Sequence, residues 1–150
     1  MSEVRLPLRV CILLSAAVLI GTCRSADDRS IIGGGPCSTM AGDANRNAPI
    51  VCVDDSSRLL KVSHETIVAH HVAASDKKPV VVQWFTKSGG GDLQIDIRPG
   101  CVTDLKCDGR GHCKAKTVPV DKETRCKYDV WITGDKHDRL DPDVVVVPCC

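Results

Sequence analysis

Apolar and β-branched residues in this chain recur in short runs that turn residues separate, a pattern typical of strands rather than helices. Eight such runs follow one another, over residues 50–53, 59–62, 66–72, 80–86, 93–97, 113–117, 126–133 and 144–147. Alternation is clearest in 93–97 and 126–133, which each place apolar side chains on one face and mostly polar ones on the other. The pattern predicts an all-β fold, an antiparallel β-sandwich of seven to eight short strands.

Three residues add detail to this architecture. Trp84 lies in a central predicted strand, and a late predicted strand carries Cys126 and Tyr128. This arrangement resembles that of immunoglobulin-like sandwiches, in which a Trp packs near a disulfide and a Tyr lies two residues before the late Cys. Here Tyr128 instead follows Cys126 by two residues. The resemblance implies an immunoglobulin-like architecture, with Cys52 as the early partner of Cys126, and implies no function.

The first 25 residues have the pattern of a secretory signal peptide. Two arginines precede a largely apolar run over residues 10–20, and small residues follow it. This run is too short to span a bilayer, which takes about 20 apolar residues. The chain therefore divides into a signal peptide over residues 1–25, a flexible leader over 26–48 and the sandwich domain over 49–150.

Cys23 is a candidate for lipidation. The stretch Ile20-Gly21-Thr22-Cys23 is similar to a bacterial lipobox, whose Cys is acylated, although Thr22 departs from the usual Gly, Ala or Ser. Cleavage after Cys23 or after Ser25 is the alternative. Membrane contact is thus expected only through the signal peptide or a lipid anchor, and the localisation is secreted or periplasmic, in the cell envelope.

Once Cys11 and Cys23 are set aside, an even number of cysteines remains, which suits complete pairing in an oxidising compartment. The eight disulfide candidates are Cys37, Cys52, Cys101, Cys107, Cys113, Cys126, Cys149 and Cys150. Because adjacent cysteines usually bond to different partners, Cys149 and Cys150 are expected to pair with Cys37 and Cys52.

The four central cysteines, residues 101 to 126, permit three pairings, and their spacing does not choose among them. His112 beside Cys113 raises a zinc site as the alternative. Structural zinc sites favour cysteines two to four residues apart, whereas the first three here are six apart, so disulfides are favoured.

Histidines and aspartates are the other candidate metal ligands. His70 and His71 are neighbours on a predicted strand, so their side chains point to opposite faces, and a site would need help from His64, His112 or His137. An acidic loop contains Asp135, Asp138, Asp141 and Asp143, without the spacing of an EF-hand. We expect no metal site and no cofactor.

Trp131 is the candidate binding residue. It shares a strand face with polar residues, so it is either exposed for a partner or covered on both sides of its strand. Lys and Arg total 20 against 19 Asp and Glu, which gives no field that attracts nucleic acid. No Gly-x-Ser-x-Gly motif or phosphate-binding loop is present.

These features predict an exported, non-enzymatic binding or structural module with an unknown protein or glycan as its partner. The alternative is an exported metal-binding protein that uses the histidines and the acidic loop.

Overall fold

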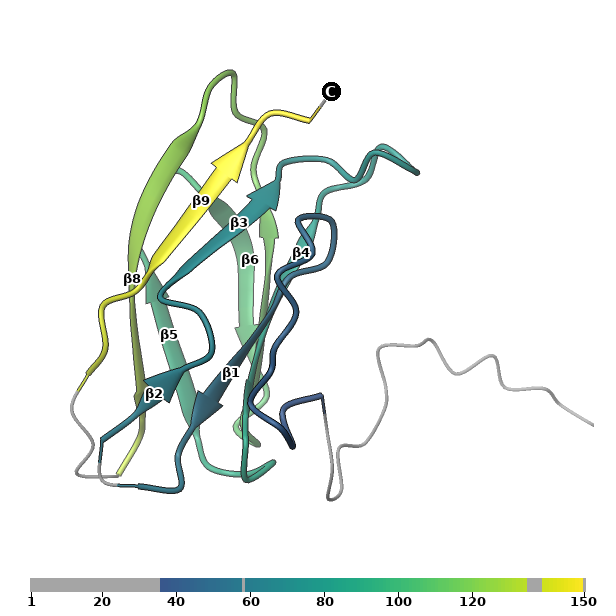
Figure 1. Ribbon diagram of the computed structural model, residues 1–150. Coiled ribbons are helices and arrows are strands. Elements are labelled where there is room, and N and C mark those ends of the chain that lie inside the picture. The colour runs from purple at the N-terminus through teal and green to yellow at the C-terminus, as the bar shows by residue number, and fades with distance from the viewer. Residues whose placement is uncertain (1–35, 58, 135–138, 150) are drawn as a thin grey trace, which may run out of the picture. The chain divides into compact units, whose positions relative to one another are not determined.

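The computed structural model describes residues 36–57, 59–134 and 139–149 of the chain, and it forms a sandwich of two β-sheets (Figure 1). Within these residues the strands are β1 (Ile50–Asp54), β2 (Lys61–Val62), β3 (Thr66–His70), β4 (Val81–Thr86), β5 (Leu93–Ile97), β6 (Val102–Cys107), β7 (His112–Thr117), β8 (Thr124–Ile132) and β9 (Asp143–Val147). The predicted signal peptide, Cys23, Asp135, His137, Asp138 and Cys150 lie outside the described residues. No helix in the described part is long and apolar enough to cross a membrane.

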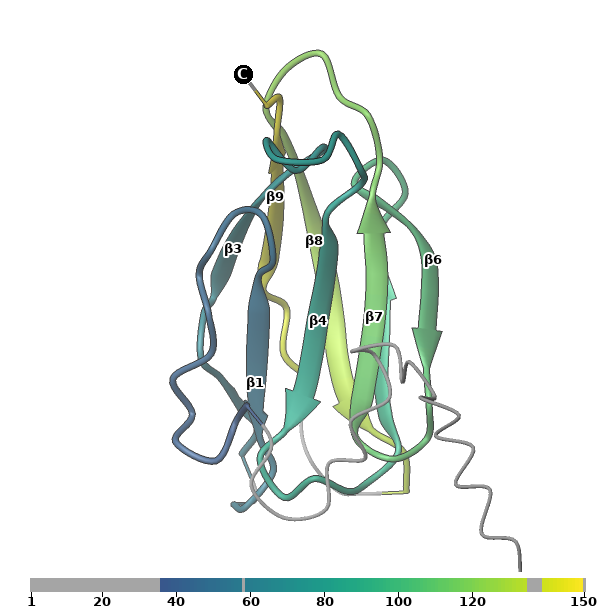
Figure 2. The ribbon, with the colours of Figure 1, turned by 90° about the vertical axis from the view of Figure 1, so that its right-hand side faces the viewer.

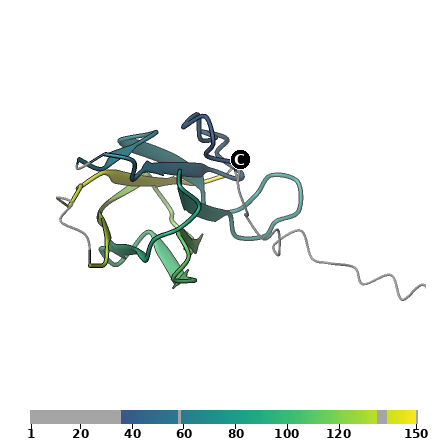
Figure 3. The same ribbon diagram turned by 90° about the horizontal axis from the view of Figure 1, so that it is seen from below.

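One sheet has five strands in the order β2-β1-β4-β7-β6, and the other has four in the order β3-β9-β8-β5. Figures 2 and 3 show the two sheets as facing layers. The predicted β-sandwich is therefore confirmed. Two pairings, β1 with β4 and β3 with β9, are parallel, because the chain crosses between the sheets before it returns to a neighbouring strand.

Each of the eight predicted segments contains a strand, and β6 is the strand that the sequence did not predict. Its residues are largely polar and lie between two cysteines, which favoured a loop. Asp104 has a positive φ of 55°, and the register with β7 shifts between Thr103 and Lys106. Such a bulge is typical of an edge strand, where it hinders pairing with another chain.

The core lies between the two sheets and is built around the pair Trp84 and Tyr128. Trp84 lies on β4 and Tyr128 on β8, so the pair connects the sheets. Their rings meet edge to face with centroids 5.6 Å apart, a favourable aromatic geometry. Branched aliphatic side chains surround them, among them Val51, Val53, Ile67, Val82, Val130, Val144 and Val146.

Burial raises the pKa of the Tyr128 phenol above its ordinary range, with a smaller contribution from the negative charge of Asp143, and the Trp84 side chain partly opposes this rise. In the unfolded chain the Tyr128 phenol ionises near the ordinary tyrosine pKa of about 10, whereas in the folded protein it keeps its proton to higher pH. The stability that Tyr128 contributes is therefore fully present below about pH 10 and is lost as the pH rises above it.

Tyr128→Phe should remove this loss. We expect the unfolding equilibrium constant of the wild type to rise by up to tenfold per pH unit above about pH 10, relative to the Phe variant. The Tyr128 hydroxyl is buried and has no hydrogen-bond partner of normal geometry among the described residues, so the variant should match the wild type at neutral pH. Urea unfolding from about pH 8 to about pH 11 measures the difference. If the free energies of unfolding of the two proteins changed in parallel with pH, the raised pKa of Tyr128 would be contradicted.

The described end of the predicted leader packs on the outer side of β1. Cys37 is buried and bonded to Cys52, and Met40, Ile50 and Phe85 pack around the disulfide. Backbone bonds between Asp43 and Ile50 extend this attachment. A small second core thus covers part of the outer face of the five-stranded sheet, over β1 and β4.

Three disulfides join six of the eight candidate cysteines: Cys37–Cys52, Cys101–Cys126 and Cys107–Cys113. The second joins the start of β6 to β8 and so links the two sheets, whereas the third joins opposite residues of β6 and β7. Disulfides of this number are typical of proteins from an oxidising, extracellular or periplasmic compartment. The zinc alternative for the four central cysteines is wrong, because all four are bonded to sulfur.

The pairings predicted for Cys37 and Cys52 are also wrong, because these two cysteines bond to each other. Cys52 bonds neither to the end of the chain nor to Cys126, because its side chain lies on the outer face of β1, beneath the returning leader. Cys126 faces the core on the other sheet. Cys149 is partly exposed and forms no disulfide within the described residues.

Candidate binding face

The candidate site lies on the outer face of the four-stranded sheet, over β5 and β8. Core-facing residues of β8 alternate with outward-facing ones, among them Lys127, Asp129 and Trp131. On β5 the outward set begins with Gln94 and Asp96 and continues just beyond the strand with Arg98. We call these six residues the β8 face.

Strand pairing arranges the β8 face in rows. Gln94 is opposite Trp131, and Asp96 is opposite Asp129. The next row holds Arg98 and Lys127, whose backbones are joined by a 3.1 Å hydrogen bond from Arg98 N to Lys127 O. A polar aromatic row, an acidic row and a basic row therefore follow one another along the strands.

Trp131 is partly exposed and is covered by one charged side chain. The Arg139 guanidinium carbon lies 4.5 Å from the centre of the indole ring, within the range of a cation–π contact. The backbones of Val130 and Leu140 exchange hydrogen bonds of 3.1 and 3.2 Å, which hold Arg139 beside Trp131. Sequence patterning placed Trp131 on the polar face of its strand, but it gave no signal for Arg139.

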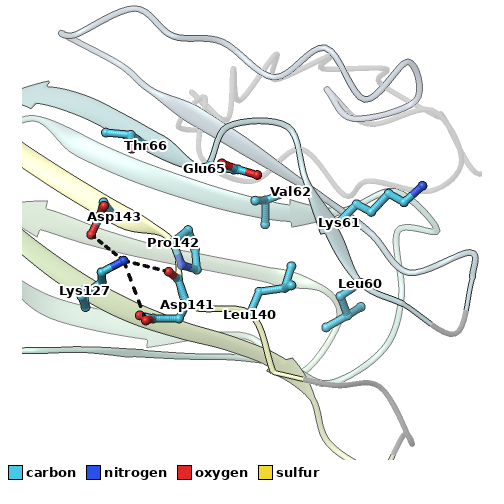
Figure 4. A pocket seen from close by; sticks show the side chains of 10 residues that line it. All are labelled: Leu60, Lys61, Val62, Glu65, Thr66, Lys127, Leu140, Asp141, Pro142 and Asp143. Atoms are coloured by element: carbon cyan, nitrogen blue, oxygen red, sulfur yellow. Dashed lines mark hydrogen bonds and ion pairs between the residues drawn. The ribbon is translucent and has the colours of Figure 1, made fainter.

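A pocket of about 460 Å³ adjoins this face (Figure 4). It is lined by Leu60, Lys61, Val62, Glu65, Thr66, Lys127, Leu140, Asp141, Pro142 and Asp143. The lining therefore combines aliphatic side chains with charges of both signs. The sequence did not predict this pocket, because it combines two connections that are distant in the chain.

Lys127 organises one wall of the pocket, as Figure 4 shows. Its Nζ lies 3.3 Å from Asp143 Oδ1 and donates a 3.2 Å hydrogen bond to the backbone oxygen of Asp141. Asp143 also accepts a 3.0 Å hydrogen bond from Arg125. Two members of the predicted acidic loop thus neutralise cations of β8, and no metal ion is needed to explain their placement.

The predicted histidine candidates do not converge. The His70 ring is hydrogen-bonded to Asn47 at 2.9 Å, and the His64 ring to Ser63 at 2.8 Å. His112 stacks on Phe85 with ring centroids 4.3 Å apart, and its Nε2 lies 3.2 Å from Gln83 Oε1. His71 Nδ1 is buried. In the described part of the chain, no three His, Cys, Asp or Glu residues are grouped so that they could hold a metal ion.

Comparison with known proteins gives little to set beside this geometry. No protein-family model matches the chain, and no curated protein matches it. Among solved structures, it is similar to the cysteine protease inhibitor EhICP2 from Entamoeba histolytica, with 12% sequence identity. That match covers 68% of this chain and 96% of the inhibitor, with a TM-score of 0.33. A likeness this distant indicates no function for the chain.

Proposed function

We propose that this protein is an exported, disulfide-bonded module that binds a macromolecular partner through the β8 face and catalyses no reaction. The observation that carries the proposal is the pairing of Trp131 and Arg139 at the side of a pocket with aliphatic and charged lining. Trp and Arg are the residue types most enriched among those that dominate interface energies. The three disulfides suit export, and one of them, Cys101–Cys126, attaches β8, which presents this face, to the other sheet.

The rigidity of the surface supports binding by a preformed site. Trp131 and Lys127 lie on a nine-residue strand whose alternate residues are buried in the core. Arg139 is attached to the same strand by backbone hydrogen bonds. A partner would therefore meet side chains that are already positioned, which reduces the entropic cost of binding.

Trp131→Ala is the test of this proposal. We expect the variant to keep its fold but to retain at least about tenfold less partner than the wild type, because an interface Trp commonly contributes more than about 1 kcal/mol. Protein with intact disulfides is immobilised and exposed to material from its native compartment. Bound proteins and glycans are then quantified by mass spectrometry.

Lys114→Ala provides the matched control, because Lys114 lies on β7 in the opposite sheet. The control variant should retain the same partner as the wild type, and Arg139→Ala should show part of the loss seen with Trp131→Ala. Equal capture by the wild type and by the Trp131 and Arg139 variants would remove the β8 face from the proposal.

A further inference from the structure

The acidic and basic rows of the β8 face each place like charges directly opposite each other. Asp96 faces Asp129 across the two strands, and Arg98 lies beside Lys127. Like charges at opposite positions of a strand pair destabilise a sheet. No other described residue forms an ion pair with Asp96, Asp129 or Arg98. Within the described part of the chain, no direct ion pair therefore offsets the repulsion in the acidic row.

The two rows have a fixed spacing and order. They lie two residues apart along the strands, which corresponds to about 7 Å. A surface that complements them must offer cations opposite Asp96 and Asp129, and anions opposite Arg98 and Lys127 at the same spacing. The β8 face of a second copy is such a surface after a half-turn. The axis of this rotation lies parallel to the sheet and runs across the strands, in the direction of the rows.

We infer that the partner of the β8 face is a second copy of this chain, docked face to face with twofold symmetry. This inference rests on the proposed function and names its partner. The axis lies between the two rows, so that Asp129 of each copy faces Lys127 of the other, and Asp96 faces Arg98. The same residues then serve on both sides, as in an isologous dimer. The chain's net charge of +1 opposes such association only weakly.

Asp141 and Asp143 limit the complementary area to β5 and β8. In the docked pair, Asp141 of each copy would face Asp143 of the other. Each of these carboxylates already contacts Lys127 of its own chain. Partly exposed charges contribute little individually and are screened by salt. The dimer is therefore expected to be weak and salt-sensitive, visible by sedimentation at up to about 1 mM protein and lost at about 0.5 M salt.

Charge reversal with mixing is the decisive experiment. The acidic-row variant is Asp96→Arg with Asp129→Lys, and the basic-row variant is Arg98→Glu with Lys127→Gln. Gln is chosen at 127 because Lys127 also holds Asp141 and Asp143, whereas Arg125 continues to pair with Asp143. Each variant alone should associate more than about tenfold more weakly than the wild type. An equal mixture of the two should form a one-to-one heterodimer.

Lys106→Glu with Lys114→Gln is the matched control for the net charge of the basic-row variant, because both variants lower the charge by three. These two residues are opposite each other on β6 and β7 in the other sheet. This variant should dimerise like the wild type. The neutral variant Asp96→Asn with Asp129→Asn gives a second readout: it should raise the thermal stability of the dilute monomer while it weakens association, because it removes the repulsion in the acidic row.

Three results would overturn the inference: a wild type that stays monomeric at about 1 mM in low salt, reversed variants that still self-associate, or a mixture that forms no heterodimer. Loss of self-association together with Trp131-dependent capture of another molecule would leave the proposed function intact. Absence of both would remove the two proposals together.

Discussion

Trp84→Ala is expected to lower the free energy of unfolding by about 3 to 5 kcal/mol, whereas Trp131→Ala should lower it by only about 1 kcal/mol. Trp84 is fully buried in β4, the middle strand of the five-stranded sheet, and its loss would leave a cavity against Tyr128. Trp131 lies on the outside of the other sheet, where its main described contact is Arg139. These are the two Trp residues of the chain, so the two variants compare a buried Trp with a partly exposed one in the same protein.

Equilibrium urea unfolding, followed by far-ultraviolet circular dichroism with the disulfides intact, measures both values. The Trp84 indole nitrogen has no hydrogen-bond partner of normal geometry among the described residues, so the loss arises from packing rather than from polar contacts. Trp84→Phe should accordingly lose less than Trp84→Ala. A loss for Trp131→Ala as large as that for Trp84→Ala would show that Trp131 is a core residue and would weaken its role in binding.

The positions of the strands could be predicted from the sequence because most have a buried face that imposes alternation. Segment 126–133 is the clearest case, since β8 extends over Thr124–Ile132 with alternate residues buried. β6 could not be predicted because an edge strand with a bulge buries little and so carries no such pattern. The composition of a strand thus reports its burial more than its hydrogen bonding.

Pairing between distant strands could not be predicted for a different reason. Alternation places Asp96 and Asp129 on polar faces, but only the register of β5 with β8 places them opposite each other. Cysteine pairing depends on the same long-range information, so a leader that folds back over β1 brought Cys37 to Cys52 against expectation. The candidate residue Trp131 was accessible to sequence reasoning, whereas its partner Arg139, the rows and the pocket were not.

Removal of the inter-sheet disulfide is expected to destabilise the protein more than removal of the hairpin disulfide. Cys101 and Cys126 are 25 residues apart, whereas Cys107 and Cys113 are 6 apart. Loop-closure entropy then gives about 3.5 kcal/mol for the first bridge and about 2 kcal/mol for the second. Cys101 and Cys126 are also both buried between the sheets, so their replacement by alanine adds a packing loss.

The paired variants Cys101→Ala with Cys126→Ala, and Cys107→Ala with Cys113→Ala, isolate this difference because each leaves no free thiol at its site. The free energy of unfolding in urea and the yield of folded protein should fall further for the first pair than for the second. When Cys107–Cys113 is removed, β6 and β7 remain joined by their backbone hydrogen bonds. When Cys101–Cys126 is removed, the start of β6 loses its covalent link to β8. Equal losses, or a larger loss from the hairpin pair, would show that the link between the two sheets does not set the stability of the sandwich.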